Sequence, residues 1–173
     1  GAAAEDLNDD GYLDLLLLSG TGNRLFVNNQ DGTFRDVTSD SGLDWIRPDG
    51  THGEPRQPII ADFDNDGVQD IVITYVNGAH AFKKVRVSKY EDVTAKAGLG
   101  GEGLVGGPAT ALDFDKDGLL DLYIGYFGQY TEGILPTLAR VNTNGLPNKL
   151  FRNKGDVAFE DVTVKAGVAG NVW

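Results

Sequence analysis

Short apolar runs, separated by polar stretches rich in glycine, recur along the whole chain. The three clearest runs are LLLL at 15–18, IVITYV at 71–76 and LYIGYF at 122–127. Each is bounded by turn-forming residues, and the second and third are rich in β-branched or aromatic side chains. Runs this short are typical of strands buried on both faces, because a helix needs a longer periodic segment. The pattern therefore predicts a β protein made of short strands.

Further apolar segments flank each run and predict four strands per repeat. One strand precedes the second and third runs, at QPIIA (57–61) and GPATAL (107–112). Another strand follows each run, at RLFVNN (24–29), AFKKVRV (81–87) and KLFRN (149–153). The last strand includes a recurring Asp-Val-Thr motif, at FRDVT (34–38), YEDVT (90–94) and FEDVT (159–163). Four antiparallel strands in about fifty residues are typical of a propeller blade. The predicted fold class is all-β, a β-propeller segment of about three four-stranded antiparallel blades.

The repeat spacing indicates one continuous array. Acidic loops begin at Asp6, Asp62 and Asp113, which are 56 and 51 residues apart, and the third repeat carries 18 additional residues between Asp121 and Phe151. Closed propellers have about four to eight blades, so we expect further blades from a longer parent protein or from neighbouring chains. We predict one partial propeller domain over 1–173, with blades at about 1–43, 57–99 and 107–168 and the start of a next blade at 169–173.

Each acidic loop repeats one arrangement of oxygen-bearing side chains. The loops are DLNDDGYLD (6–14), DFDNDGVQD (62–70) and DFDKDGLLD (113–121). Positions 1, 3, 5 and 9 carry side-chain oxygens, position 6 is always glycine, and position 7 varies as expected if only its carbonyl is used. The predicted metal ligands are Asp6, Asn8, Asp10, Tyr12 and Asp14; Asp62, Asp64, Asp66, Val68 and Asp70; and Asp113, Asp115, Asp117, Leu119 and Asp121.

Calcium is the ion that this arrangement favours. Hard oxygen ligands on a flexible loop suit calcium better than zinc or copper, and magnesium demands stricter octahedral geometry. Two carboxylates about 4 Å apart near a protein surface repel each other by about 4 kcal/mol, so the loops need a cation. Position 12, where an EF-hand requires glutamate, is Leu17, Ile73 or Ile124. We therefore predict three calcium sites that are not EF-hands, in hairpin loops of the blades.

Taken together, these motifs resemble FG-GAP/VCBS repeats. DFDNDGVQDIVI (62–73) and DFDKDGLLDLYIG (113–125) are similar to the calcium-binding hairpins of integrin α-type propellers. NNQDGTFRDVTSDSGL (28–43) and NGLPNKLFRNKGDVAFEDVTVKAGV (144–168) are similar to the variant in cartilage acidic protein-like (ASPIC/UnbV-associated) proteins. The resemblance covers nearly the whole chain and implies a secreted or periplasmic β-propeller with calcium at the loop side chains named above. It implies no single activity, because members adhere, scaffold or decorate larger proteins. The second repeat departs from the pattern, with RVSKY (86–90) where the first has QDGTF.

Composition and charge exclude several classes of partner. With a formal net charge of −11 and a pI of about 4.4, the chain lacks the basic face that nucleic acid or an anionic membrane would need. No apolar run approaches the ~18–20 residues that cross a bilayer, so no membrane insertion is expected. The chain has no cysteine, which rules out disulfides and thiolate metal sites.

Residues outside the loops carry weaker functional signals. His52 and His80 are predicted to be surface residues and not a catalytic pair. Trp45 is assigned to packing or a rim contact in preference to a sugar platform. The basic segment HAFKKVRVSK (80–89) is predicted to be a solvated outer strand, with a docking face for an acidic partner as the alternative.

The long insertion in the third repeat is the candidate partner-binding segment. Binding residues concentrate in long loops on rigid scaffolds. The candidate partner-binding residues are Tyr126, Phe127, Tyr130, Leu135 and Arg140. The alternative is that the insertion only packs over its own blade.

These observations favour a non-catalytic, calcium-binding scaffold. We expect an extracellular, cell-surface or periplasmic protein, because cytosolic calcium is too scarce to fill weak loops. Its expected partners are another protein, through interaction or adhesion, or further blades of the same parent protein. The alternative is an accessory or catalytic propeller of a polysaccharide-active enzyme, or a glycan-binding module. No Ser-His-Asp arrangement or phosphate-binding glycine loop stands out, so no catalytic residue is assigned.

Overall fold

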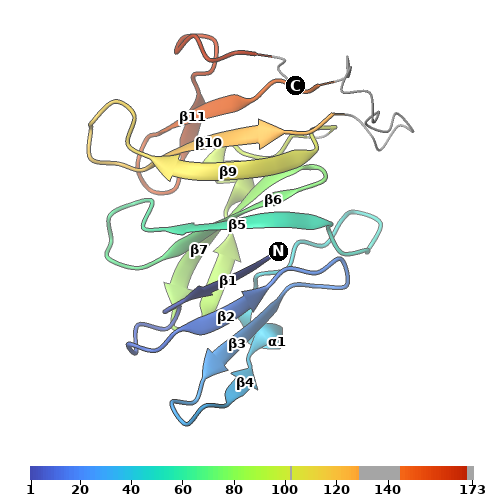
Figure 1. The fold of residues 1–173 in the computed structure, drawn as a ribbon, viewed down its shortest axis with the longest axis vertical. Helices are drawn as coiled ribbons and strands as arrows, with labels where there is room; N and C mark the ends of the chain where they lie inside the picture. Colours follow the sequence, from blue (N-terminus) through green and yellow to red (C-terminus); the bar gives the residue numbers. More distant parts are fainter. Residues whose placement is uncertain (102, 129–144, 171–173) are drawn as a thin grey trace.

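The computed structural model describes residues 1–101, 103–128 and 145–170, whose strands form three sheets (Figure 1). Each sheet has four antiparallel strands in sequence order. The first contains β1 (Ala2–Glu5), β2 (Asp14–Leu17), β3 (Arg24–Asn28) and β4 (Phe34–Asp36). The second contains β5 (Pro55–Ala61), β6 (Asp70–Tyr75), β7 (Gly78–Arg86) and β8 (Lys89–Asp92). The third contains β9 (Gly106–Leu112), β10 (Asp121–Tyr126), β11 (Lys149–Asn153) and β12 (Phe159–Asp161). This architecture confirms the predicted all-β class, and it is consistent with propeller blades.

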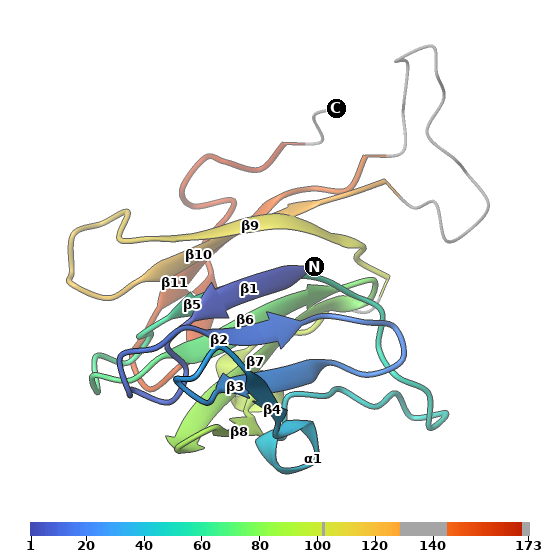
Figure 2. The same ribbon diagram turned by 60° about the horizontal axis from the view of Figure 1, so that its bottom comes forward.

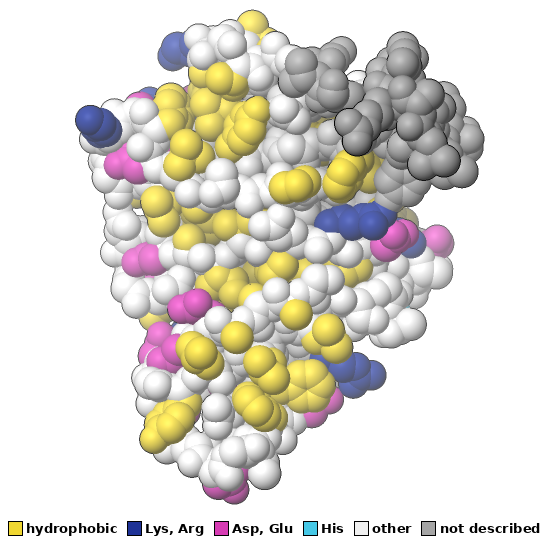
Figure 3. Space-filling view, in the orientation of Figure 1, with side chains coloured by type: hydrophobic (Ala, Val, Ile, Leu, Met, Phe, Trp, Pro, Cys, Tyr) yellow, Lys and Arg dark blue, Asp and Glu magenta, His cyan; other side chains and the backbone are white. Residues whose placement is uncertain are grey.

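The three sheets stack in chain order, with their first strands at the same edge of the stack (Figure 1 and Figure 2). β5 contacts both β1 and β9, so these first strands lie side by side. Figure 3 shows the face that they form: hydrophobic side chains gather over its middle, and acidic side chains lie around its margin. The acidic loops, which join the first strand of each sheet to the second, all lie on one side of the stack. Stacking therefore brings the loops of neighbouring sheets close together.

Alternation along the second strand of each sheet explains the stacking. Successive side chains of a strand point to opposite faces. In β6, Ile71 and Ile73 belong to the core shared with the first sheet, whereas Val72 belongs to the core shared with the third. In β10, Leu122 and Ile124 pack against the second sheet in the same way, and all five side chains are fully buried. The apolar runs predicted from the sequence therefore form the packing surfaces between sheets.

The recurring Asp-Val-Thr motif ties the last strand of each sheet to the third strand. Its aspartate accepts the N–H of its threonine at 2.9, 2.9 and 3.1 Å in the three repeats. The threonine hydroxyl accepts a third-strand N–H, from Leu25, Ala81 or Leu150, at 3.0, 3.1 and 3.0 Å. In the first two repeats the chain then enters a short helix, α1 (Thr38–Ser41) or α2 (Thr94–Ala97). Within the described residues, no helix is long and apolar enough to cross a membrane.

Two predictions about the second repeat are wrong. Segment 80–89 is not an outer strand, because β7 is the third strand of its sheet, and the side chain of Lys84 is only 3% exposed. The second half of the segment is solvated, since Val85 and Val87 are 45% and 65% exposed. Lys84 is covered because it reaches Asp9 in the loop of the preceding sheet. His80 is buried and not on the surface, because its ring packs 4.0 Å from that of Trp45 in the connector between the first two sheets.

Candidate metal centres

Each acidic loop is folded around its first aspartate. In Asp6, Asp62 and Asp113, Oδ1 accepts the N–H of position 5 at 3.1, 3.1 and 3.2 Å. Oδ2 accepts the N–H of the position-6 glycine at 2.7, 2.9 and 3.1 Å. These glycines have φ of 86°, 90° and 89°, which is a region that favours glycine. The backbone geometry is therefore the same in all three repeats.

Position 7 is held through its backbone, whatever its side chain. The N–H of Tyr12, Val68 and Leu119 donates to Oδ1 of the position-5 aspartate at 2.9, 3.0 and 3.0 Å. Position 4 also has a positive φ, at 64°, 58° and 62° in Asp9, Asn65 and Lys116. Sequence reasoning missed position 4, because lysine is not a residue that signals this conformation.

The position-9 aspartates are fully buried and join each loop to its sheet. Oδ1 of Asp14, Asp70 and Asp121 accepts the N–H of the third-strand residue Asn28, Lys84 or Asn153, at 2.9, 2.9 and 2.8 Å. In the first and third loops, Oδ2 accepts the N–H of position 2, at 3.1 and 3.0 Å. In the second loop, Oδ2 of Asp70 is buried and has no hydrogen-bond partner among the described residues. Burial raises the pKa of Asp70 to about 6.

The structure brings three carboxylates together in two of the loops. Ligand oxygens of Asp62, Asp64 and Asp66 all lie within 4.8 Å of one another, and so do those of Asp113, Asp115 and Asp117. In the first loop, position 3 is Asn8, whose Oδ1 accepts the Asp10 N–H at 3.0 Å and whose amide donates to Asp10 Oδ2 at 3.1 Å. Two aspartate triads that could bind metal are therefore present, and a site in the first loop stays a prediction.

The donor set fits calcium. All the side-chain donors are oxygens, most of them carboxylates, which hard divalent cations prefer. Asp70 belongs to the same loop as the second triad, and the charges of Asp64 and Asp66 add to the effect of burial in raising its pKa. A cation held by this loop would offset the repulsion between its carboxylates. The side chains at positions 1, 3, 5 and 9 and the position-7 carbonyl are the groups that would hold it.

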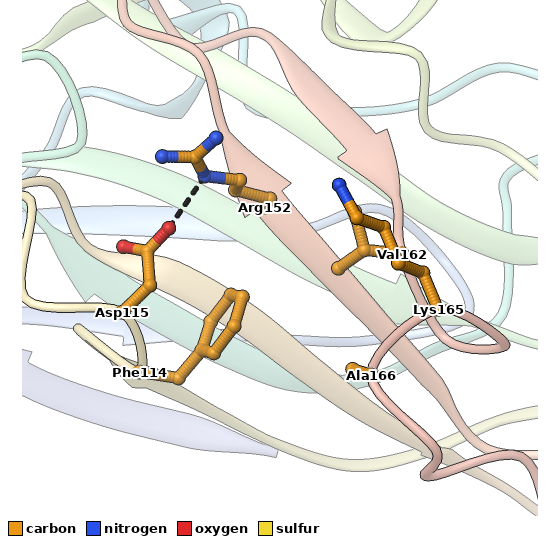
Figure 4. Close-up of a pocket in the computed structure, with 6 residues that line it drawn as sticks. All are labelled: Phe114, Asp115, Arg152, Val162, Lys165 and Ala166. Carbon is orange, nitrogen blue, oxygen red and sulfur yellow. Dashed lines mark ion pairs between the residues drawn. The ribbon is translucent and has the colours of Figure 1, made fainter.

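Two third-strand cations contact the triads, and sequence reasoning did not assign them to the loops. Lys83 Nζ donates to Asp64, and this hydrogen bond raises the pKa of Lys83. Arg152 lies 2.6 Å from Asp115 through Nε (Figure 4). It lies 2.9 Å from Asp117 through Nη2. Both cations directly follow the phenylalanine that recurs in the third strand, and the first repeat has valine there. This shared position is the signal that could have revealed them.

A cavity of about 230 Å³ lies beside the third loop, lined by Phe114, Asp115, Arg152, Val162, Lys165 and Ala166 (Figure 4). Phe114, at loop position 2, is 39% exposed. Its equivalents Leu7 and Phe63 are fully buried in the cores shared with the following sheet. The cavity therefore lies where the first two repeats pack against their next neighbour.

Comparison with protein families identifies the first part of the chain. Residues 6–73, from the first acidic loop into β6, match the family described as FG-GAP-like repeat. This segment is an FG-GAP-like repeat. The match confirms the resemblance seen in the sequence, and the FG-GAP-like segment includes the first two acidic loops. The third sheet has the same strand order and loop geometry. Comparison with curated proteins gave no match.

The candidate partner-binding residues are only partly described. Tyr126 is 6% exposed and packs in the core between the second and third sheets, so its side chain faces that core. Phe127, the next residue, is 39% exposed. Tyr130, Leu135 and Arg140 lie outside the described residues. Partner binding by the insertion stays a prediction.

Proposed function

We propose that this chain is a calcium-binding, non-catalytic scaffold for protein–protein interaction or adhesion, which acts in an extracellular, cell-surface or periplasmic space. The observation that carries the proposal is the aspartate triad of the second loop, which also contains the buried Asp70, whose Oδ2 has no hydrogen-bond partner among the described residues. Calcium takes six to eight oxygen ligands at about 2.3–2.6 Å, which loop side chains, a backbone carbonyl and water could together supply. The third loop repeats the triad.

Contacts between neighbouring loops support a structural role for the ion. The Asn65 side chain of the second loop donates to the Gly118 carbonyl of the third loop at 2.9 Å. Asn153 of the third sheet donates to the Phe63 carbonyl of the second loop at 2.7 Å. An ion in one loop would therefore restrain backbone that also contacts the next sheet. Stabilising the stack is the role this placement favours over hydrolysis, which needs an open coordination position.

The outer face of the first sheet supports association with further blades of the parent protein. Leu15 and Leu17 are 39% and 44% exposed, although their equivalents Ile71 and Ile73 are fully buried against a preceding sheet. The Asn28 side chain donates to the Leu13 carbonyl at 3.1 Å. The equivalent residue of the third sheet, Asn153, donates in the same way to the Leu120 carbonyl at 2.8 Å. Asn153 also bonds the loop of the preceding sheet. Apolar groups and an equivalent amide donor are thus in place for a preceding blade.

Calcium titration calorimetry on the full chain tests the metal part of the proposal. The double variants Asp64→Asn/Asp66→Asn and Asp115→Asn/Asp117→Asn should each lose calcium binding at their own loop. Asp40→Asn/Glu91→Gln removes the same charge from exposed positions outside the loops and should bind as the wild type does. Wild-type protein that binds no calcium at millimolar concentration would refute the proposal.

Light scattering tests the scaffold part. If apolar outer faces are association surfaces, the chain alone should self-associate in calcium, and Leu15→Lys/Leu17→Lys should reduce this. Lys89→Glu/Lys154→Glu changes charge at positions away from that face and serves as the control. A strictly monomeric wild type, or association unaffected by the leucine changes, would contradict this part of the proposal.

A further inference from the structure

The three loops differ in charge at position 3, and a residue of the third strand compensates for the difference. The first loop has Asn8 at position 3, whereas the second and third have Asp64 and Asp115. The residue after the third-strand phenylalanine is Val27 in the first repeat, but Lys83 in the second and Arg152 in the third. A cation is therefore present only where position 3 adds a carboxylate. When the formal charges of the side chains at loop positions 1, 3, 5 and 9 and at this third-strand position are added, the total is the same in each repeat.

The geometry shows that the compensation acts locally. Lys83 contacts Asp64, which is the position-3 carboxylate, and Arg152 lies 2.6 Å from the equivalent Asp115. The position-3 carboxylates are 6% and 26% exposed and the cations 25% and 35% exposed, so the pairs are partly shielded from water. Charge pairs of this kind are screened less than fully exposed pairs. These cations therefore occupy carboxylates that a divalent ion would also use.

We propose that Lys83 and Arg152 are tethered counter-ions that compete with calcium and set the affinity of the second and third loops. The inference rests on the proposed calcium binding and deepens it. A dication that enters either loop must displace the lysine or arginine side chain from its carboxylate ligands. The free energy of that displacement reduces the affinity of the loop for the dication. The first loop has no such competitor at the equivalent position.

The second loop also has a place for the displaced side chain. Lys83 Nζ lies 3.2 Å from Asp156 Oδ1, on the outer hairpin of the third sheet. When calcium binds Asp64, the ammonium group can remain paired with Asp156. Calcium binding would then shift Lys83 from a contact within its own sheet to one between sheets. Removing Asp156 should make displacement harder and weaken calcium binding at the second loop.

Glycine amides at position 6 give each loop its own reporter. The N–H groups of Gly11, Gly67 and Gly118 donate to the position-1 aspartates, so their NMR resonances should move when calcium binds. Lys83→Met should lower the calcium concentration at the midpoint for Gly67 at least tenfold, equal to about 1.4 kcal/mol, and shift the midpoints for Gly11 and Gly118 much less. Arg152→Met should do the same for Gly118. Lys89→Met removes the same charge from β8 of the same sheet and should change none of the three.

Three further variants test the direction and the cause of the effect. Asn8→Asp adds a carboxylate without a tethered cation and should tighten binding at Gly11. Asp156→Asn should move the Gly67 midpoint to higher calcium. Lys83→Gln keeps a polar side chain and should behave like Lys83→Met if charge is the cause.

The outcomes separate the two proposals. Normal calcium binding by the wild type, with unchanged or weaker binding in the Lys83 and Arg152 variants, would overturn the counter-ion inference alone. The same conclusion would follow if both Lys83 variants failed to fold, because Lys83 would then be a structural requirement. If none of the three glycines of the wild type responds to millimolar calcium, both the proposed function and this inference fail.

Discussion

The buried carboxyl of Asp70 makes the stability of the metal-free protein depend on pH in an unusual direction. Its Oδ1 accepts the Lys84 N–H at 2.9 Å, but its buried Oδ2 has no partner among the described residues. Burial therefore favours the protonated form and raises the pKa of Asp70 from an ordinary value of 3.8 to about 6. Asp70→Asn removes the titrating group and keeps an oxygen that can accept the Lys84 N–H.

The size and sign of the effect follow from these two pKa values. Between pH 3.8 and about 6 the folded chain binds more protons than the unfolded chain, so the free energy of unfolding falls as pH rises. The penalty is absent below pH 3.8 and complete above about pH 6, where it reaches at most about 3 kcal/mol at 1.36 kcal/mol per pKa unit. That is a large share of the roughly 5–15 kcal/mol that stabilises a typical domain. Carboxyls with a lowered pKa, such as Asp36 and Asp156, act in the opposite sense but below pH 3.8.

Urea unfolding in chelator at half-unit steps from pH 4 to pH 7 measures this dependence. Wild-type protein should lose stability across the window. Asp70→Asn should lose less, and what remains has the sign expected from Asp14, whose pKa burial also raises. Asp121→Asn is the matched control: this aspartate is equally buried, but both of its oxygens accept backbone N–H groups. It should lower stability at every pH and keep the wild-type slope. A flat wild-type profile, or an Asp70→Asn profile as steep as the wild type, would refute the reasoning.

Three further predictions concern metal, backbone and core. Chelator should lower the melting temperature and calcium should restore it better than magnesium, since each site at 100 times its Kd adds about 2.7 kcal/mol; equal rescue by the two ions would contradict a calcium preference. Gly78→Ala should cost more than about 4 kcal/mol in urea unfolding, because its φ is 94° and an added Cβ would lie 2.0 Å from the Gly100 carbonyl oxygen. Gly20→Ala, which meets nothing within 4 Å, should be almost neutral. Leu122→Ala in the core should cost about 2–5 kcal/mol, whereas Leu112→Ala, at a 36% exposed position, should cost much less.

Local patterns predicted the strands and loops well, because their physical causes lie within a few residues. The runs at 15–18, 71–76 and 122–127 became β2, β6 and β10, because short apolar segments between turn residues favour strands. Burial on both faces holds along the whole of β6, whereas Leu15 and Leu17 of β2 are exposed. The position-6 glycines and the spaced aspartates predicted the loop geometry, because a positive φ and mutual repulsion are local properties.

Contacts between sheets were the part that sequence patterns could not supply. Segment 80–89 has basic residues on both faces of the strand, which is also the pattern of a solvated strand. Lys84 is buried only because the neighbouring sheet brings Asp9 to it, and His80 only because Trp45 folds back from a connector. The helices α1 and α2 were missed because four residues are too few for a periodic signal, although each is followed by glycine at its C-cap, Gly42 or Gly98.

The acidic loops and the packing between sheets depend on each other. The position-9 aspartate binds the N–H of the third-strand residue whose side chain reaches the preceding loop, as Asp70 does with Lys84 and Asp121 with Asn153. Lys84 then contacts Asp9, and Asn153 donates to the Phe63 carbonyl. Any ion that fixes a position-9 carboxylate therefore also restrains the residue that joins its sheet to the one before it. The same coupling would apply at Asn28 if a blade preceded the first sheet, so calcium would stabilise the stack blade by blade and not only within each loop.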